Sequence, residues 1–355
     1  MNFKRFLKLA VLCMSVLIIF ACESVDEPAQ ESQVNNEAVT TEAVTTEESV
    51  DKLSVLATTP MIAEYVRQVG NDNIDLSILM PYSADPHSFE ASPQDAIKIA
   101  DADIVFYVGL KYESANLVEL LENSVASPDA LIEIGPSINP IEFSEEGHDD
   151  HEGHGHDDHE GHGHDDDKHK DDDDDDHEGH DHGTHDPHFW LDPSRASLAI
   201  DEITTQLSVI DPDSADFYQE NATDYKSQLS DLDKQMSSVF EQIPEKDRKL
   251  VTSHEALGYL AHKYDFEIVG TVIPSMSTES GPAAIAIAKL VDDLKTEGVK
   301  GIFMESGVEE KITKQIAQDA NVEVITGLQV EYVLEGETYL QMMTKLSELI
   351  VEGLK

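Results

Sequence analysis

Two sets of short apolar runs, each alternating with amphipathic stretches, constrain what this chain of 355 residues can fold into. In the first set the strand-like runs cover residues 53–57, 74–79, 104–108 and 131–134, with helical patterns at 62–69, 93–100 and 117–121. The second set has runs at 250–251, 268–269, 302–303 and 322–325, with helical patterns at 257–264, 283–297, 312–320 and 339–352. Such alternation is typical of βαβ units with a mostly parallel sheet. The sequence therefore predicts an α/β fold of two (β/α) lobes.

A single long helix is predicted between the two sets. Apolar residues recur there at steps of three and four, the spacing of one helix face; they are Tyr218, Ala222, Tyr225, Leu229, Leu232, Met236 and Val239. The helix spans about 214–242, between Pro212 and Pro244, and is ~40 Å long at ~1.5 Å per residue. We expect an N-terminal lobe at 51–210, a rigid connecting helix at 211–244 and a C-terminal lobe at 245–355.

The first 50 residues predict export and a membrane tether. Basic residues at positions 4, 5 and 8 precede an apolar run at 9–21, as in a signal peptide covering residues 1–21. That run of 13 residues is shorter than the about 20 that a spanning helix needs. The segment ending in Cys22 resembles a bacterial lipobox, in which the cysteine is acylated; an ordinary signal with a coincidental cysteine is the alternative. Residues 22–50, acidic and without Lys or Arg after the cysteine, predict a flexible tether.

Charge and cysteine usage exclude two classes of partner or site. With 23 Lys and Arg against 73 Asp and Glu, the formal net charge is -50, which repels a polyphosphate backbone and excludes nucleic acid as a main partner. The same excess favours cations as partners. The only cysteines, Cys13 and Cys22, lie in the N-terminal segment, so the body has no disulfide or thiolate metal site.

Residues 145–186 form a low-complexity insertion with 12 His, 20 acidic residues and two Lys. Like charges repel along this tract and almost no apolar residue is available to pack, so we expect it to be disordered without metal. Imidazole is a ligand of transition metals, which makes the tract a candidate low-affinity metal collector. A solvating acidic loop and a pH-responsive spacer are the alternatives. Ordering a long loop around one ion costs entropy, so we do not expect the tract to be the tight site.

Four histidines lie outside the insertion: His87, His188, His254 and His262. The first three each sit where a strand or loop leads into a helix, and in α/β folds ligands bind in the crevice outside the strand ends. A single such histidine is more often a cap or a surface residue, but three at equivalent edges predict a shared site. His262, eight residues beyond His254, is expected on the surface.

The segments around His87, His188 and His254, together with the long connecting helix, resemble the metal-binding solute receptors of bacterial ABC importers, and more specifically their zinc-receptor branch. The resemblance covers the chain from about Leu53 to its end. It implies two lobes around a cleft, no enzymatic activity, and one ion held between the lobes by the three histidines. Manganese receptors usually carry a carboxylate at the third position, so His254 favours Zn²⁺, which also suits imidazole ligands.

The fourth ligand is left open by the sequence. By register Gln329 is nearest to the position where relatives place an Asp or Glu, and Glu331 or a water molecule are the alternatives. Glu279 and Glu305 resemble residues at the cleft edge in the family, although a helix cap and a solvated carboxylate are the plainer interpretations. Trp190 is expected either to shield the ion or to fill the core.

The predicted function is an extracytoplasmic, lipid-anchored, monomeric receptor that captures Zn²⁺ and delivers it to a membrane permease. Three alternatives are kept. The chain could be a manganese receptor, a surface adhesin or metal store that works through its His-rich tract, or a secreted zinc hydrolase with an open coordination position. The hydrolase is disfavoured because the sequence lacks a His-Glu-x-x-His motif.

Overall fold

The computed structural model describes residues 52–82, 84–142, 185–279, 281–305 and 310–355. Residues 51–355 form one compact unit. The predictions for the signal peptide, the tether and Cys22 lie outside the described residues. So does the predicted insertion, except for His185 and Asp186 at its end. Within the described ranges, no helix combines the length and apolar character needed to cross a bilayer.

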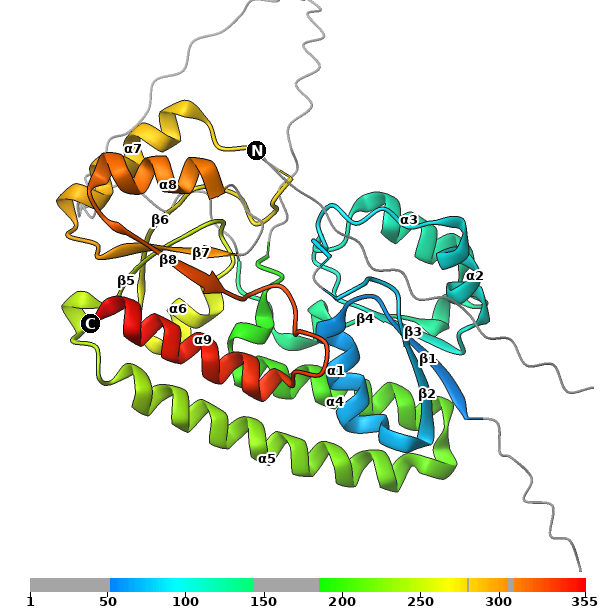
Figure 1. Cartoon of the computed structure of the whole chain (residues 1–355). Helices are drawn as coiled ribbons and strands as arrows, with labels where there is room; N and C mark the ends of the chain where they lie inside the picture. Colours follow the sequence, from blue (N-terminus) through cyan, green and yellow to red (C-terminus); the bar gives the residue numbers. More distant parts are fainter. Residues whose placement is uncertain (1–51, 83, 143–184, 280, 306–309) are drawn as a thin grey trace, which may run out of the picture. The chain divides into compact units, whose positions relative to one another are not determined.

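The first lobe is built on a parallel four-stranded sheet with strand order β2-β1-β3-β4. Its elements follow the predicted alternation: β1 (Leu53–Ala57), α1 (Pro60–Gly70), β2 (Ile74–Ile78), α2 (Pro93–Asp101), β3 (Ile104–Tyr107), α3 (Ala115–Ser124) and β4 (Leu131–Glu133). Helices α2 and α3 lie together on one side of this sheet (Figure 1). A small core of buried apolar residues, including Leu56, Val105 and Leu117, fills the space between them.

The second lobe repeats this topology. Its four strands are also parallel, in the order β6-β5-β7-β8. The elements are β5 (Lys249–Thr252), α6 (Gly258–Tyr264), β6 (Glu267–Thr271), α7 (Ala284–Thr296), β7 (Gly301–Glu305), α8 (Glu310–Ala320), β8 (Glu323–Leu328) and α9 (Tyr339–Leu354). Helices α7 and α8 cover the outer face over a second small core that includes Ile302 and Leu294. The prediction of two α/β lobes with parallel sheets is therefore confirmed.

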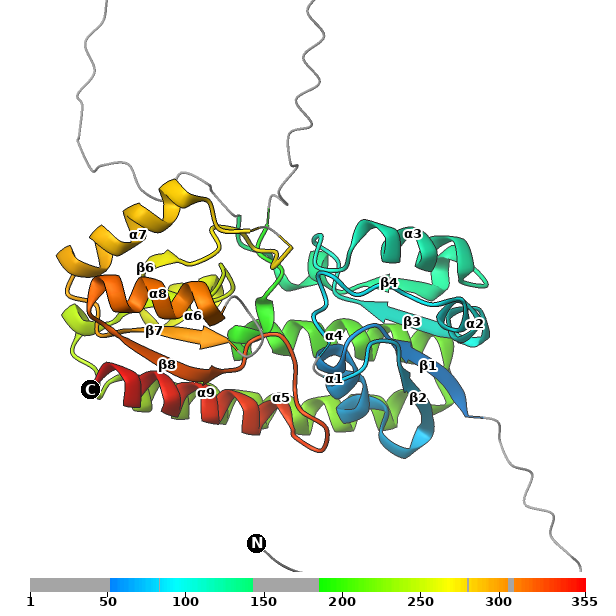
Figure 2. The same cartoon turned by 45° about the horizontal axis from the view of Figure 1, so that its top comes forward.

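One continuous core joins the two lobes. It runs from Val55 in the first sheet to Phe303 in the second and includes the buried faces of α1, α9, α4 (Pro193–Ile210) and α5 (Ala215–Phe240). Figure 2 shows α5 running along both lobes and α4 lying beneath the first lobe, on the side opposite α3 and α7. Because the lobes share this core, they are braced against one another along one side.

Helix α5 carries the predicted apolar stripe. Tyr218, Ala222, Tyr225, Leu229, Leu232 and Met236 are buried as expected, and Phe240 rather than the half-buried Val239 completes the row. Helix geometry explains the difference. A residue four positions after Met236 points closer to the direction of Met236 around the helix axis than a residue three positions after it, so Phe240 faces the core more directly than Val239. Its 26 residues span ~39 Å at ~1.5 Å per residue.

Proline and short polar residues set where several helices begin. Thr59 accepts a hydrogen bond from the Ile62 amide ahead of α1, and Asp192 accepts one from the Ser194 amide ahead of α4. Each is followed by a proline at the first helical position, where its missing N–H costs no hydrogen bond.

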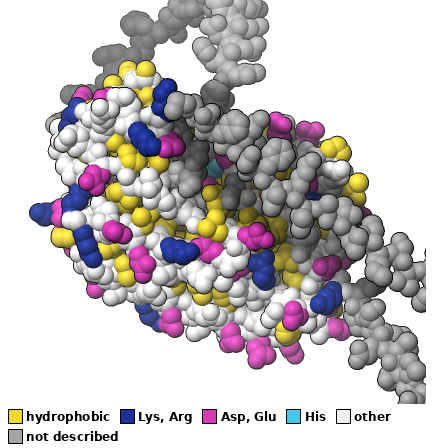
Figure 3. Space-filling view, in the orientation of Figure 1, with side chains coloured by type: hydrophobic (Ala, Val, Ile, Leu, Met, Phe, Trp, Pro, Cys, Tyr) yellow, Lys and Arg dark blue, Asp and Glu magenta, His cyan; other side chains and the backbone are white. Residues whose placement is uncertain are grey.

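On the face drawn in Figure 3, acidic and basic side chains are interspersed, and a histidine is visible in the hollow between the lobes.

The shared core predicts a strong effect of truncation at the centre of α5. Leu229→Ala removes a fully buried side chain, so we expect a loss of about 2–5 kcal/mol in the free energy of unfolding, measured by urea denaturation. Gln228→Ala, at an exposed position of the same helix, is the control and should change stability by less than about 0.5 kcal/mol. Equal effects of the two changes would contradict the role of α5 as a core helix.

Candidate metal centre

The residues that could hold a metal lie near the carboxyl ends of the strands. In both sheets the strand order reverses beside the first strand of the lobe, between β1 and β3 and between β5 and β7. A crevice outside such ends is the usual ligand site of parallel α/β folds. His254 follows β5 by two residues, and Glu305 ends β7, which pairs with β5. His87 lies in the segment after β2.

Four buried side chains converge at this crevice. Ligand atoms of His87, His188, His254 and Glu331 all lie within 4.8 Å of one another, and the residues are between 0% and 7% exposed. The Glu331 Oε1 atom is 3.9 Å from His87 Nε2, 3.4 Å from His188 Nε2 and 2.8 Å from His254 Nε2. The structure thus brings together all three predicted histidines and adds a carboxylate.

None of these four atoms has a hydrogen-bond partner of acceptable geometry. Buried polar atoms in proteins are nearly always satisfied, and the exceptions call for an explanation such as a bound ion. Bonds of about 2.0–2.2 Å from zinc to imidazole nitrogen or carboxylate oxygen place tetrahedral ligand atoms about 3.3 Å apart. The spacing around Glu331 Oε1 brackets that value, so the four side chains fit one tetrahedral cation.

The opposite ring nitrogen of each histidine fixes the ring in place. His188 Nδ1 lies 2.8 Å from Asp186 Oδ1, His254 Nδ1 lies 2.8 Å from Glu305 Oε1, and His87 Nδ1 donates to the Tyr112 carbonyl at 3.1 Å. With Nδ1 as the donor, the neutral ring keeps its Nε2 lone pair for the centre. Partners of this kind orient metal-binding histidines and raise their basicity.

The loop between β8 and α9 holds Glu331 in position. The Tyr112 hydroxyl donates to Glu331 Oε2 at 2.8 Å, and burial together with Glu331 keeps the pKa of Tyr112 well above its usual range, so the hydroxyl remains a donor. Trp190 Nε1 donates to the Val330 carbonyl at 2.6 Å. The Gln329 side chain instead donates to the Tyr332 carbonyl and to Glu337 within the same loop.

The charged groups of the centre shift one another's pKa values. Burial by itself would lower the pKa of His188, but Glu331 and Asp186 outweigh burial and raise it to about 9. Burial also acts to lower the pKa of His254, yet Glu305 and Glu331 hold it well above its usual range. For Glu331 the burial would raise the pKa, whereas the imidazoles keep it well below. In the metal-free centre the ionised Glu331 carboxylate therefore lies beside protonated His188 and His254, whose positive charge a divalent cation can replace.

Among the alternatives that the sequence left open at the fourth position, Glu331 lies beside the histidines, whereas Gln329, the residue nearest by register, shapes the loop. One expectation from the sequence was wrong. Glu305 is not a solvated carboxylate, because it is 4% exposed and bonded to His254. A signal for Glu305 was present: a strand-end carboxylate on β7 must lie beside a residue that follows the neighbouring strand β5.

The remaining expectations have mixed outcomes. Asp186, assigned by composition to the disordered insertion, is 4% exposed and bonded to both His188 Nδ1 and the His188 amide. Trp190 is fully buried and its ring lies 5.6 Å from that of His188, so it fills the core and also shields the centre. His262 is exposed, as predicted, and Glu279 is exposed at the edge of the cleft.

Two proteins similar to this chain are named as substrate-binding lipoproteins of ABC transporters. The manganese ABC transporter substrate-binding lipoprotein PsaA of Streptococcus mitis is 28% identical over 362 residues, covering 99% of each chain. The metal ABC transporter substrate-binding lipoprotein SsaB of Streptococcus sanguinis is 26% identical over 357 residues, covering 98% of this chain and 97% of that protein.

Solved structures share the fold. The periplasmic zinc binding protein TroA from Treponema pallidum superposes with a TM-score of 0.70 at 22% identity, covering 85% of this chain and 99% of that one. An Mn-bound mutant of a periplasmic metal binding protein from Candidatus Liberibacter asiaticus also gives 0.70, at 23% identity and with coverage of 86% and 100%. The family described as "Zinc-uptake complex component A periplasmic" (ZnuA) matches residues 55–353. This match spans nearly all of the two lobes, and the chain therefore belongs to the ZnuA family, as the sequence resemblance predicted.

Proposed function

We propose that this chain is the extracytoplasmic receptor of a metal ABC importer, that it binds one Zn²⁺ through His87, His188, His254 and Glu331, and that it delivers the ion to a membrane permease. The single observation that carries the proposal is the convergence of four buried ligand atoms without hydrogen-bond partners. Membership of a family of metal-binding receptors supports it and excludes the hydrolase alternative.

The choice of zinc rests on the donor set. Three imidazole nitrogens and one carboxylate oxygen match the usual ligands of tetrahedral zinc, whereas manganese prefers oxygen donors and higher coordination. Manganese is kept as a second candidate, because relatives such as PsaA are named as manganese lipoproteins. Acylation at Cys22, anchoring to the cell membrane and a monomeric state remain predictions; the first two are supported by the lipoprotein names of the relatives. The adhesin alternative depends on the tract outside the described residues.

Calorimetric titration of the metal-free protein tests the site directly. We expect one tightly bound Zn²⁺ per chain and weaker binding of Mn²⁺. His254→Ala should weaken zinc binding by at least about 100-fold, since removing even an outer partner of a ligand costs about 10–100-fold. His262→Ala changes an exposed histidine eight residues away and serves as the control with unchanged affinity. Wild-type zinc affinity in His254→Ala would contradict the proposed site, and tighter binding of Mn²⁺ than Zn²⁺ would support the manganese alternative.

The partner of His188 predicts an effect without any loss of a ligand. Asp186→Asn keeps the shape of the side chain but removes the charge that orients the ring and raises its basicity, so we expect zinc affinity to fall by about 10–100-fold. Asp213→Asn, an exposed aspartate ahead of α5, is the matched control with unaltered affinity. Circular dichroism should be the same for both variants. An affinity equal to that of the control would mean that Asp186 does not tune the centre.

The raised pKa of His188 predicts that zinc binding releases protons. Below a pKa of about 9 the His188 imidazole holds a proton that the ion must displace, so the affinity should rise with pH up to about 9. The expected slope is about tenfold per pH unit for each proton displaced. Calorimetry at pH 7 in buffers of different ionisation enthalpy should report release of at least about one proton per ion. Affinity that stays constant between pH 6 and 9 would be inconsistent with this charge arrangement.

A further inference from the structure

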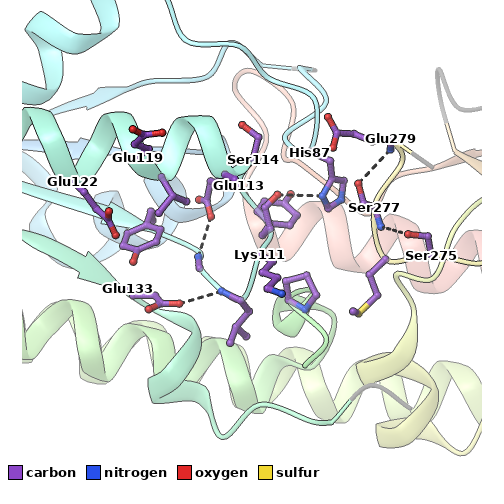
Figure 4. A pocket seen from close by; sticks show the side chains of 18 residues that line it. His87, Lys111, Glu113, Ser114, Glu119, Glu122, Glu133, Ser275, Ser277 and Glu279 are labelled. Atoms are coloured by element: carbon purple, nitrogen blue, oxygen red, sulfur yellow. Dashed lines mark hydrogen bonds between the residues drawn. The ribbon is translucent and has the colours of Figure 1, made fainter. Parts of the chain in front are cut away.

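A cavity of about 690 Å³ opens between the lobes beside the metal centre. On the first lobe it is lined by the loop after β3, the start of α3 and Glu133 of β4, and on the second lobe by Ser275, Met276, Ser277 and Glu279 (Figure 4). A water molecule occupies about 30 Å³ in the liquid. The cavity therefore has room for a divalent ion together with its first hydration shell.

His87 connects this cavity to the centre. Of the four residues at the centre, His87 is the one that lines the cavity within the described part of the chain. It is 3% exposed, and its Nε2 atom has no hydrogen-bond partner. Its ring is held by the Tyr112 carbonyl, and Tyr112 itself lines the cavity. An ion in the cavity thus meets His87 before the three deeper side chains.

The cavity wall is strongly acidic. Glu113, Glu119, Glu122, Glu133 and Glu279 line it, against the single basic residue Lys111 among the described residues. Glu119, Glu122 and Glu279 are exposed. Burial, and after it the charges of Glu133 and Glu113, raise the pKa of the Tyr107 hydroxyl, which lines the same wall.

These carboxylates have different tasks from the ligands of the centre. Glu113 is buried and accepts hydrogen bonds from the amides of Val108 and Gly109, and Glu133 accepts one from the Leu110 amide (Figure 4). Within the described ranges, the group at His87 is the single one whose ligand atoms converge on one point. The acidic wall therefore attracts a cation without chelating it, which allows the ion to move on.

We infer that this acidic cavity is the route by which the ion reaches the centre, with the carboxylates of the wall raising its association rate and His87 acting as the first ligand. The inference rests on the proposed function. A cleft lined by charges of one sign concentrates oppositely charged ligands and accelerates their binding, and screening by salt removes the effect. The ion exchanges its water molecules for His87 first and then for the deeper side chains.

Stopped-flow measurement of Zn²⁺ association with the full chain tests the steering. We expect Glu119→Gln combined with Glu122→Gln to slow association about threefold or more at low ionic strength, with little change in the dissociation rate, and we expect the difference to vanish at high salt. The control is Glu220→Gln combined with Asp224→Asn, which removes the same charge from exposed positions of α5. A slowing that is equal in both double variants, or absent in the first, would overturn the inference.

A steric variant separates the route from the charge. Val118→Trp places a large ring in the cavity wall and should slow association and dissociation together, leaving the equilibrium affinity nearly unchanged. Asn116→Trp, an exposed position on the same helix outside the cavity, is the control and should change neither rate. Unchanged rates in Val118→Trp would assign the ion another route. If the unaltered chain binds no Zn²⁺ tightly, the proposed function itself fails, and this outcome is distinct from both kinetic results.

Discussion

The buried Glu331 carboxylate among three imidazoles is the interaction on which the rest of this structure depends. A charge in the protein interior is costly unless a charge of opposite sign compensates it. Removing one partner from such a buried set destabilises a protein by more than an exposed ion pair stabilises it. Glu331 is 7% exposed and lies between side chains from both lobes. Positive charge must therefore be present at this point, either as protons on the histidines or as a bound cation. Because the buried Glu331 carboxylate requires this positive charge, metal affinity depends on pH and on the packing of the two lobes.

Hydrogen bonds around the centre hold its four side chains in a defined geometry. Each histidine is held at Nδ1 by a group from its own lobe, while Glu331 is held from the first lobe by the Tyr112 hydroxyl and by Trp190 through Val330. The shared core around α5 braces the lobes on the opposite side. Since ligands from both lobes meet at one point, a cation there links the lobes directly.

Much of the fold follows from local patterns in the sequence. The alternation of apolar runs placed every strand of both sheets, and the stripe from Tyr218 to Met236 placed α5, because strand and helix periodicities are read from neighbours in the chain. Three histidines could be singled out because each lies where a strand or loop leads into a helix, and parallel strands bring such positions to one edge. The resemblance to metal receptors depended on the same three segments and on the long connecting helix, and the family match confirmed it.

The choice among the candidates for the fourth side chain, and the contacts of the outer partners, were decided by tertiary structure. The loop after β8 has no periodicity, so nothing local shows that Gln329 folds back on Tyr332 and Glu337 while Glu331 turns to the histidines. Asp186 belongs to a tract that composition assigns to disorder, but contacts with His188, Ile141 and Tyr259, all outside the tract, hold it in place. Glu305 and the acidic cavity likewise depend on how strands and lobes come together. The sequence by itself determined the elements and the candidate histidines, because these depend on local spacing, whereas the completed centre depends on distances between residues far apart in the chain.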